Sequence, residues 1–79
     1  MKVVECSPEI LKYLQKRNLV NSYIKAKTIL ESGNLQSVYF KKRKPKKYDI
    51  YYFRINKKFR AFGQFKGSLF VVTDISDHQ

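Results

Sequence analysis

The stretch that decides the fold is residues 49–75, DIYYFRINKKFRAFGQFKGSLFVVTDI. It divides into three runs rich in Val, Ile, Tyr and Phe, at 49–55, 58–65 and 68–75. The pairs Asn56-Lys57 and Lys66-Gly67, which are typical of tight turns, separate these runs. The pattern predicts three consecutive strands joined by hairpin turns.

Upstream of this stretch the hydrophobic period is helical. Residues 2–5 predict a short strand, and Ser7-Pro8-Glu9 predicts a helix start, with Ser as N-cap and Pro in the first turn. Asn18 is expected to end this helix. A second apolar stripe predicts a second helix, capped by Asn21 or Ser22 and ended by Gly33-Asn34; its members are Leu19, Tyr23, Ala26, Ile29 and Leu30.

With a further strand at 37–40, the expected order is β-α-α-β-β-β-β. This order predicts an α+β fold, with a two-helix hairpin on one face of a small twisted antiparallel sheet. Residues 1–79 are too few for a second domain, and 41–48 are expected to form a mobile basic loop without a packed element.

Alternation along the strands assigns side chains to two faces of the sheet. The inward set is predicted to be Tyr51, Phe53, Ile55, Phe59, Ala61, Gly63, Phe65, Leu69, Val71, Thr73 and Ile75. The outward set is predicted to be Ile50, Tyr52, Arg54, Arg60, Phe62, Gln64, Phe70, Val72, Asp74, Ser76 and His78. The open face thus collects arginines, a tyrosine and a histidine.

The net charge of +11 points to a polyanionic partner. Residues 41–66 hold eleven basic side chains and one acid, Asp49. An anionic membrane would also attract this segment, but membrane binding usually uses a basic amphipathic helix, and this region is predicted to be strands and loops. Nucleic acid is therefore the favoured partner.

Basic side chains with neighbouring rings are typical of single-stranded RNA binding. The candidate RNA-binding residues are Lys41, Lys42, Arg43, Lys44, Lys46, Lys47, Tyr52, Lys57 and Lys58. A solvated hairpin tip is the alternative interpretation of the lysine run. Six basic residues without acidic neighbours favour phosphate contact.

The rest of the sequence argues against a disulfide-bonded, secreted, membrane-spanning or metal-dependent protein. One cysteine, Cys6, cannot form an internal disulfide and is interpreted as a buried structural thiol. No signal peptide or apolar span is evident, so a cytoplasmic location is expected. The sequence predicts no metal site and no cofactor, because the acids are scattered and phosphate-binding glycine loops are absent.

The residue types on the predicted open face also suggest cleavage of RNA. Cleavage of RNA by attack of the ribose 2′-OH needs a proton acceptor, a proton donor and a cation that stabilises the phosphorane. His78 can take either proton role, and the arginines Arg54 and Arg60 can grip phosphate oxygens. These three residues are the candidate catalytic set.

Residues 53–60, FRINKKFR, resemble the RelE/ParE toxin superfamily, especially its YoeB-like and HigB-like branches. Those sheets carry Arg-Ile, three variable residues, an aromatic or His, then Arg. The resemblance extends to the opening strand, the helical hairpin and a histidine after the last strand. It implies a toxin of a type II toxin-antitoxin system, which cleaves mRNA in the ribosomal A site without metal and is neutralised by an antitoxin protein.

The resemblance implies roles for single residues. Arg60 matches the transition-state arginine, His78 the terminal catalytic histidine, and the lysine-rich loop the side that meets ribosomal RNA. Gln79 departs from the tyrosine of YoeB-like members, and their glutamate has no counterpart beyond Asp49 or the lysines. The ParE branch poisons gyrase with the same fold, so a non-catalytic module that binds RNA or gyrase is the alternative.

Overall fold

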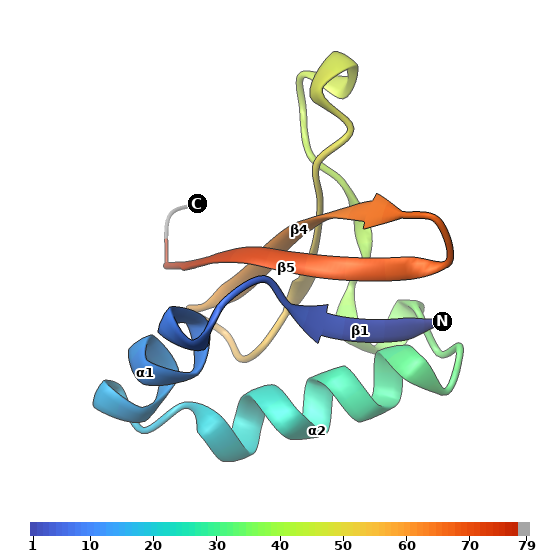
Figure 1. Ribbon diagram of the computed structural model, residues 1–79. Helices are drawn as coiled ribbons and strands as arrows, with labels where there is room; N and C mark the ends of the chain where they lie inside the picture. The colour runs from blue at the N-terminus through green and yellow to red at the C-terminus, as the bar shows by residue number, and fades with distance from the viewer. Residues whose placement is uncertain (78–79) are drawn as a thin grey trace.

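The computed structural model describes residues 1–77 as two helices and a five-stranded mixed sheet (Figure 1). In chain order the elements are β1 (Lys2–Glu5), α1 (Pro8–Lys16), α2 (Val20–Glu31), η1 (Gln36–Val38), β2 (Lys41–Lys42), η2 (Lys46–Tyr48), β3 (Tyr51–Arg54), β4 (Arg60–Lys66) and β5 (Leu69–Ser76). The two η elements are single 3₁₀ turns. The α+β class is confirmed.

The sheet order is β1-β5-β4-β3-β2, with antiparallel pairing everywhere except between β1 and β5. The expectation of an antiparallel sheet was therefore wrong for one pair. The physical reason lies in the connection, because β1 is followed by helices rather than by a hairpin turn. Strands that are not joined by a tight turn can pair in parallel.

Both helices lie on one face of the sheet, as Figure 1 shows. Between the helices and the sheet lies a core with seven large side chains that are almost completely buried: Val3, Leu14, Tyr23, Leu30, Phe53, Phe70 and Val72. This packing leaves the opposite face of the sheet free of helices. The candidate site is built on that face.

The predicted helix ends are mostly confirmed. Ser7 has extended backbone at the N-cap of α1, with Pro8 in the first turn. Asn18 and Gly33, with φ of 58° and 92°, take the left-handed conformation that stops each helix. The cap predicted for α2 was wrong, because Leu19 occupies that position and is buried in the core.

The strand predicted at 37–40 was also wrong. Val38 is buried at the end of η1, and Tyr39 follows with a left-handed φ of 55°. Phe40 then stacks on Tyr51, with ring centroids 5.5 Å apart and planes 8° from parallel. The 3₁₀ turn at Gln36–Val38 and the left-handed backbone of Tyr39 both depart from the extended conformation that a strand needs. The strand therefore begins only at Lys41.

A β-bulge corrects the predicted faces of β5. Phe62 pairs with Asp74, but Gly63 pairs with Val72, so Thr73 is an extra residue opposite β4. The extra residue reverses the alternation on one side of it. Phe70 and Val72 are thus buried under the helices, and the inward assignment of Leu69, Val71 and Thr73 was wrong. Asp74 lies on the open face, as predicted.

Close approach of two backbones at the bulge requires a glycine. A Cβ atom added at Gly63 would collide with the carbonyl oxygen of Val71 and would lie 3.0 Å from the Phe70 ring. Only a residue without a side chain fits there. The bulge and Gly63 together set which side chains of β4 and β5 reach the open face.

One polar network ties β1 to α2. The Tyr23 hydroxyl donates to Glu5 Oε2 at 2.6 Å, and Lys27 Nζ donates to the same oxygen at 2.8 Å. Burial raises the pKa of Glu5, but the hydrogen bonds from Lys27 and Tyr23 outweigh it and leave that pKa below its ordinary value. The charged form of Glu5 therefore stabilises the fold.

We expect Glu5→Gln to lower the free energy of unfolding by about 2 kcal/mol near neutral pH, because it removes the charge that Lys27 and Tyr23 contact. A carboxyl with a depressed pKa stabilises above its ordinary pKa of about 4.3, and this contribution is lost as pH falls through the folded value. Urea unfolding of both proteins across this range should show the difference shrinking in acid. A constant difference would contradict the assignment.

Cys6 is exposed, so its interpretation as a buried thiol was wrong. It lies just beyond β1, and its backbone N–H donates to the Val72 carbonyl at 2.9 Å.

Within residues 1–77, no helix is long and apolar enough to cross a membrane.

Candidate nucleic-acid interface

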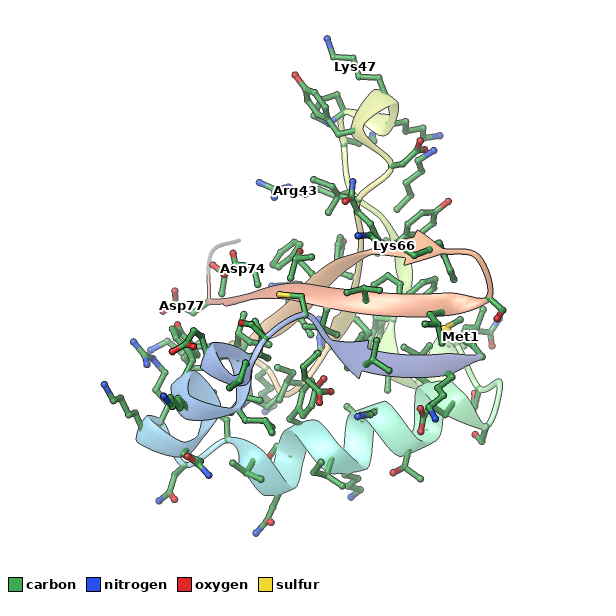
Figure 2. All side chains as sticks on the ribbon, in the orientation of Figure 1. Met1, Arg43, Lys47, Lys66, Asp74 and Asp77 are labelled. Carbon is green, nitrogen blue, oxygen red and sulfur yellow. The ribbon has the colours of Figure 1, made fainter. Side chains whose placement is uncertain are left out.

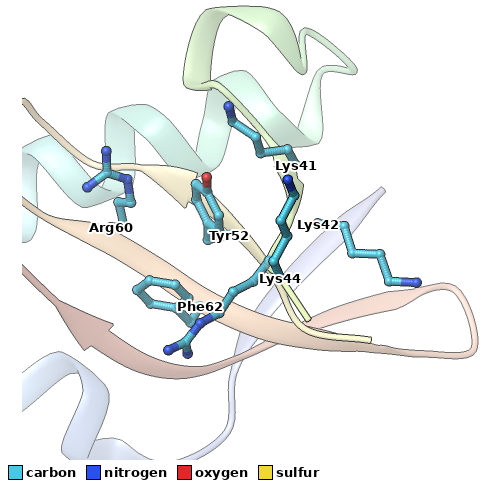
Figure 3. A pocket seen from close by; sticks show the side chains of 7 residues that line it. Lys41, Lys42, Lys44, Tyr52, Arg60 and Phe62 are labelled. Atoms are coloured by element: carbon cyan, nitrogen blue, oxygen red, sulfur yellow. The ribbon is translucent and has the colours of Figure 1, made fainter. Parts of the chain in front are cut away.

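A groove of about 480 Å³ lies on the open face, between β4 and the segment that starts at β2. Figure 3 shows its lining, which is cationic and aromatic: Lys41, Lys42, Arg43, Lys44, Tyr52, Arg60 and Phe62. No acidic side chain of the described chain is among these residues. A groove with this lining favours an anionic ligand that also has flat apolar parts.

The rings and guanidinium groups of the groove form a continuous row. The Arg60 guanidinium carbon lies 5.8 Å from the Tyr52 ring centroid, and the Arg43 carbon lies 5.1 Å from that of Phe62. The two rings are neighbours, with centroids 5.3 Å apart and planes tilted by 48°. Each cation thus lies against a ring, and this contact orients the guanidinium group.

Strand register explains the row. Tyr52 pairs with Phe62 across β3 and β4, and Lys41 pairs with Tyr52 across β2 and β3. Residues directly opposite on neighbouring strands point to the same face. The alternation that buries Phe53 and Ala61 therefore also places Tyr52, Arg60 and Phe62 on the open face.

The connection from β2 to β3 projects from the sheet as an arm, with Lys47 at its tip and Arg43 nearer its base (Figure 2). The Arg43 N–H donates to the Ile50 carbonyl at 2.7 Å, and Gln64 Nε2 donates to the Tyr48 carbonyl at 3.1 Å. The run predicted to be a loop, 41–48, contains the two-residue strand β2 and the single turn η2, and all of it except the half-buried Lys42 is exposed.

Lys42 takes a structural part in the arm. Its ammonium group lies 2.8 Å from Asp49 Oδ1, and in Figure 3 the side chain extends away from Tyr52 and Phe62. The hydrogen bond to Asp49 raises the pKa of Lys42, so it stays protonated. Of the groove lysines, Lys41 and Lys44 are therefore the better candidates for ligand contact.

Five predicted site residues that the structure describes lie outside the groove. Arg54 pairs with Arg60 in the strand register but lines a different hollow. Lys57 and Lys58 lie in the turn between β3 and β4, where Lys58 Nζ is 3.9 Å from Asp77 Oδ2. Lys46 and Lys47 belong to the η2 turn at the tip of the arm. The predicted RNA-binding set is thus spread over three places.

The predicted proton-transfer residue is not part of the groove as the structure describes it. His78 lies outside the described residues, and among residues 1–77 neither a carboxylate nor a histidine lines the groove. Asp74 pairs with Phe62 on the same face but is exposed and is not part of the lining. Residues 1–77 contain no cluster of His, Cys, Asp or Glu that could hold a metal ion.

No family model, curated protein or solved structure matches this chain. The site must therefore be interpreted from its own geometry. That geometry is a groove lined by cations and by two rings, Tyr52 and Phe62, that are half-buried and buried.

Sequence reasoning placed Phe62 on the open face but did not include it in the site. Phe62 is only 8% exposed, because Arg43 and Tyr52 cover it. The available signal was its position two residues after Arg60 on one strand, which puts both side chains on the same face. Cover from the arm could not be anticipated, since it depends on how the β2–β3 connection folds back.

We expect RNA binding to weaken with salt, because neutralised phosphates release counterions. Each lost contact to a single strand should flatten the log–log slope by about 0.7, so Lys41→Gln with Lys44→Gln should flatten it by about 1.4. The matched control is Lys12→Gln with Lys16→Gln on α1, which removes the same charge from the helical side. Equal slopes for both double variants would show that the groove lysines do not contact phosphate.

Proposed function

We propose that this protein binds single-stranded RNA in the groove and cleaves it, as a ribosome-dependent mRNA endoribonuclease. The observation that carries the proposal is the position of Arg60, beside the Tyr52 ring in a groove lined by cations and rings. A phosphate held by Arg60 would place a neighbouring base against Tyr52. The resemblance of residues 53–60 to the RelE/ParE superfamily points to the same residue.

The proposed reaction is an attack by the ribose 2′-oxygen on its own phosphorus. The 2′-hydroxyl gives its proton to a base, the P–O5′ bond breaks, the 5′-oxygen takes up a proton, and the products are a 2′,3′-cyclic phosphate and a 5′-hydroxyl. Arg60 would hold the phosphorane, whose negative charge grows in the transition state. His78, which follows β5 in the sequence, is the proposed proton-transfer group.

The proposal extends to fold and partners. We assign a RelE-like topology to the β-α-α-β-β-β-β order, and a role as the toxin of a type II toxin-antitoxin pair. The ribosome and its RNA suit a chain with a net charge of +11, and an antitoxin protein would bind the groove to silence it. No cofactor is required by this chemistry.

A second candidate is RNA binding without cleavage. The observation that favours it is the lining of the groove, which within residues 1–77 offers cations and rings but no carboxylate or histidine. Such a protein would block translation by occupying RNA. This candidate predicts protection of RNA rather than new ends.

The experiment that separates the two candidates is end mapping of mRNA in a translating extract. New 5′-hydroxyl ends that require the protein support cleavage. Arrested synthesis with intact mRNA would overturn the nuclease proposal and leave the binding candidate. Binding of oligonucleotides without ribosomes gives an independent measure of RNA affinity.

A further inference from the structure

A second cationic hollow, of about 270 Å³, opens beside the end of β3. Its polar lining comes from α2, from the η1 turn and from the residues around the end of β3: Ser22, Lys25, Ser37, Arg54 and Asn56. Apolar side chains that include Ile29 and Val38 complete it, and no acidic residue of the described chain lines it. The hollow therefore has two cations, two hydroxyl groups and an apolar floor.

Arg54 is held there in an unusual way. Its guanidinium carbon lies 4.2 Å from the Tyr39 ring centroid, and its Nε is buried without a hydrogen-bond partner among the described residues. A buried N–H without a partner destabilises a fold and calls for an explanation. An anion that Arg54 turns to meet would supply the missing acceptor.

Tyr39 supports the same interpretation. It takes a left-handed backbone conformation, which is uncommon for an aromatic residue, and its ring is 53% exposed. Strained backbone that places an exposed ring against a cation is typical of functional positions. The exposed part of the ring offers a surface on which a base can stack.

Strand register connects this hollow to the groove. Arg54 and Arg60 are direct partners across β3 and β4, so the register brings the two arginines to neighbouring positions. A ligand with successive phosphates would meet both guanidinium groups. β2 pairs with β3 at Tyr51 and Tyr52 and does not extend to Arg54, where the exposed residue Tyr39 lies against the guanidinium group instead.

We infer that the hollow is a second phosphate subsite for the same RNA strand, in which Arg54 and Lys25 bind the phosphate next to the one held by Arg60. The inference rests on the proposed function and assigns Arg54 to binding rather than to bond cleavage. In this arrangement the RNA strand would run from the arm, across Arg60 and over the edge of the sheet toward α2.

The test is the dependence of binding on RNA length, measured with oligouridylates of about two to about six nucleotides. For the wild-type protein, affinity should rise about tenfold once the strand reaches the second subsite. Arg54→Gln and Lys25→Gln should each abolish this rise. Lys25 is an exposed helix residue, so its replacement leaves folding intact.

Lys16→Gln, an exposed lysine on α1, is the matched control and should keep the rise. In the labelled wild-type protein, the NMR signal of the Arg54 Nε–H should shift with the longer oligomers only. A rise that survives in Lys25→Gln, or an Arg54 signal that does not move, would overturn the inference alone. Failure of the wild type to bind RNA at any length would overturn the proposed function and the subsite with it.

Discussion

Arg60→Ala is expected to slow the proposed mRNA cleavage by about a hundred- to a thousand-fold, the usual cost of removing a group that stabilises transition-state charge. The groove lysines and Tyr52 remain in this variant, so RNA affinity should fall far less than the rate. Arg60→Lys should recover only part of the rate, because an ammonium group cannot grip two phosphate oxygens in a fork. The measurement is the rate at which 5′-hydroxyl ends appear in a translating extract.

Arg17→Ala is the matched control for this prediction. Arg17 also lies against a tyrosine, with its guanidinium carbon 3.6 Å from the Tyr13 ring centroid, but it follows α1 on the helical side. Its loss removes one arginine and one cation–π contact without touching the groove. Equal cleavage rates for Arg60→Ala and Arg17→Ala, with thermal stability unchanged in both, would exclude Arg60 from the chemistry.

Gly63→Ala is expected to destabilise the fold by about 3 kcal/mol, because the added methyl group meets backbone that cannot move aside cheaply. For a chain of this size, such a loss lowers the melting temperature by more than about 10 °C. Relief of the clash would require β5 to move away from β4 at the bulge. That movement would disturb the register that places Phe62 opposite Asp74.

Gly67→Ala provides the comparison for Gly63→Ala. Gly67 has a φ of 59° in the β4–β5 turn, and a Cβ there meets nothing within 4 Å. Only left-handed strain opposes this change, at a cost of about 1 kcal/mol. Thermal unfolding that ranks the two variants equally would contradict the steric argument.

The sequence predicted the helix boundaries and the strand faces that neighbouring residues determine. Pro8, Asn18 and Gly33 mark the helix boundaries, and the alternation around Phe53 and Ala61 identifies the buried face of β3 and β4. These signals act over a few residues and are visible in a single chain. Arg60 and Tyr52 followed directly from that alternation.

The sequence did not predict features that depend on contacts between residues far apart in the chain. The bulge at Thr73 arises where β4 and β5 approach closely at Gly63, and no local pattern distinguishes it from regular alternation. The parallel pairing of β1 with β5 joins segments from opposite ends of the chain. The hollow at Arg54 likewise needs α2 and the η1 turn to be in place. Each of these is a property of the assembled fold.

Pairing of the first strand with the last determines when the chain can finish folding. Val3 finds its partner Phe70 only after the helices and the other strands have been synthesised, and Phe70 is also part of the core. Contacts of such large sequence separation slow folding, because the chain loses much entropy before they form. While the polypeptide is still being made, β1 and the core face of α2 lack their cover. The sheet is therefore complete only after β5 has been synthesised and has paired with β1 and β4.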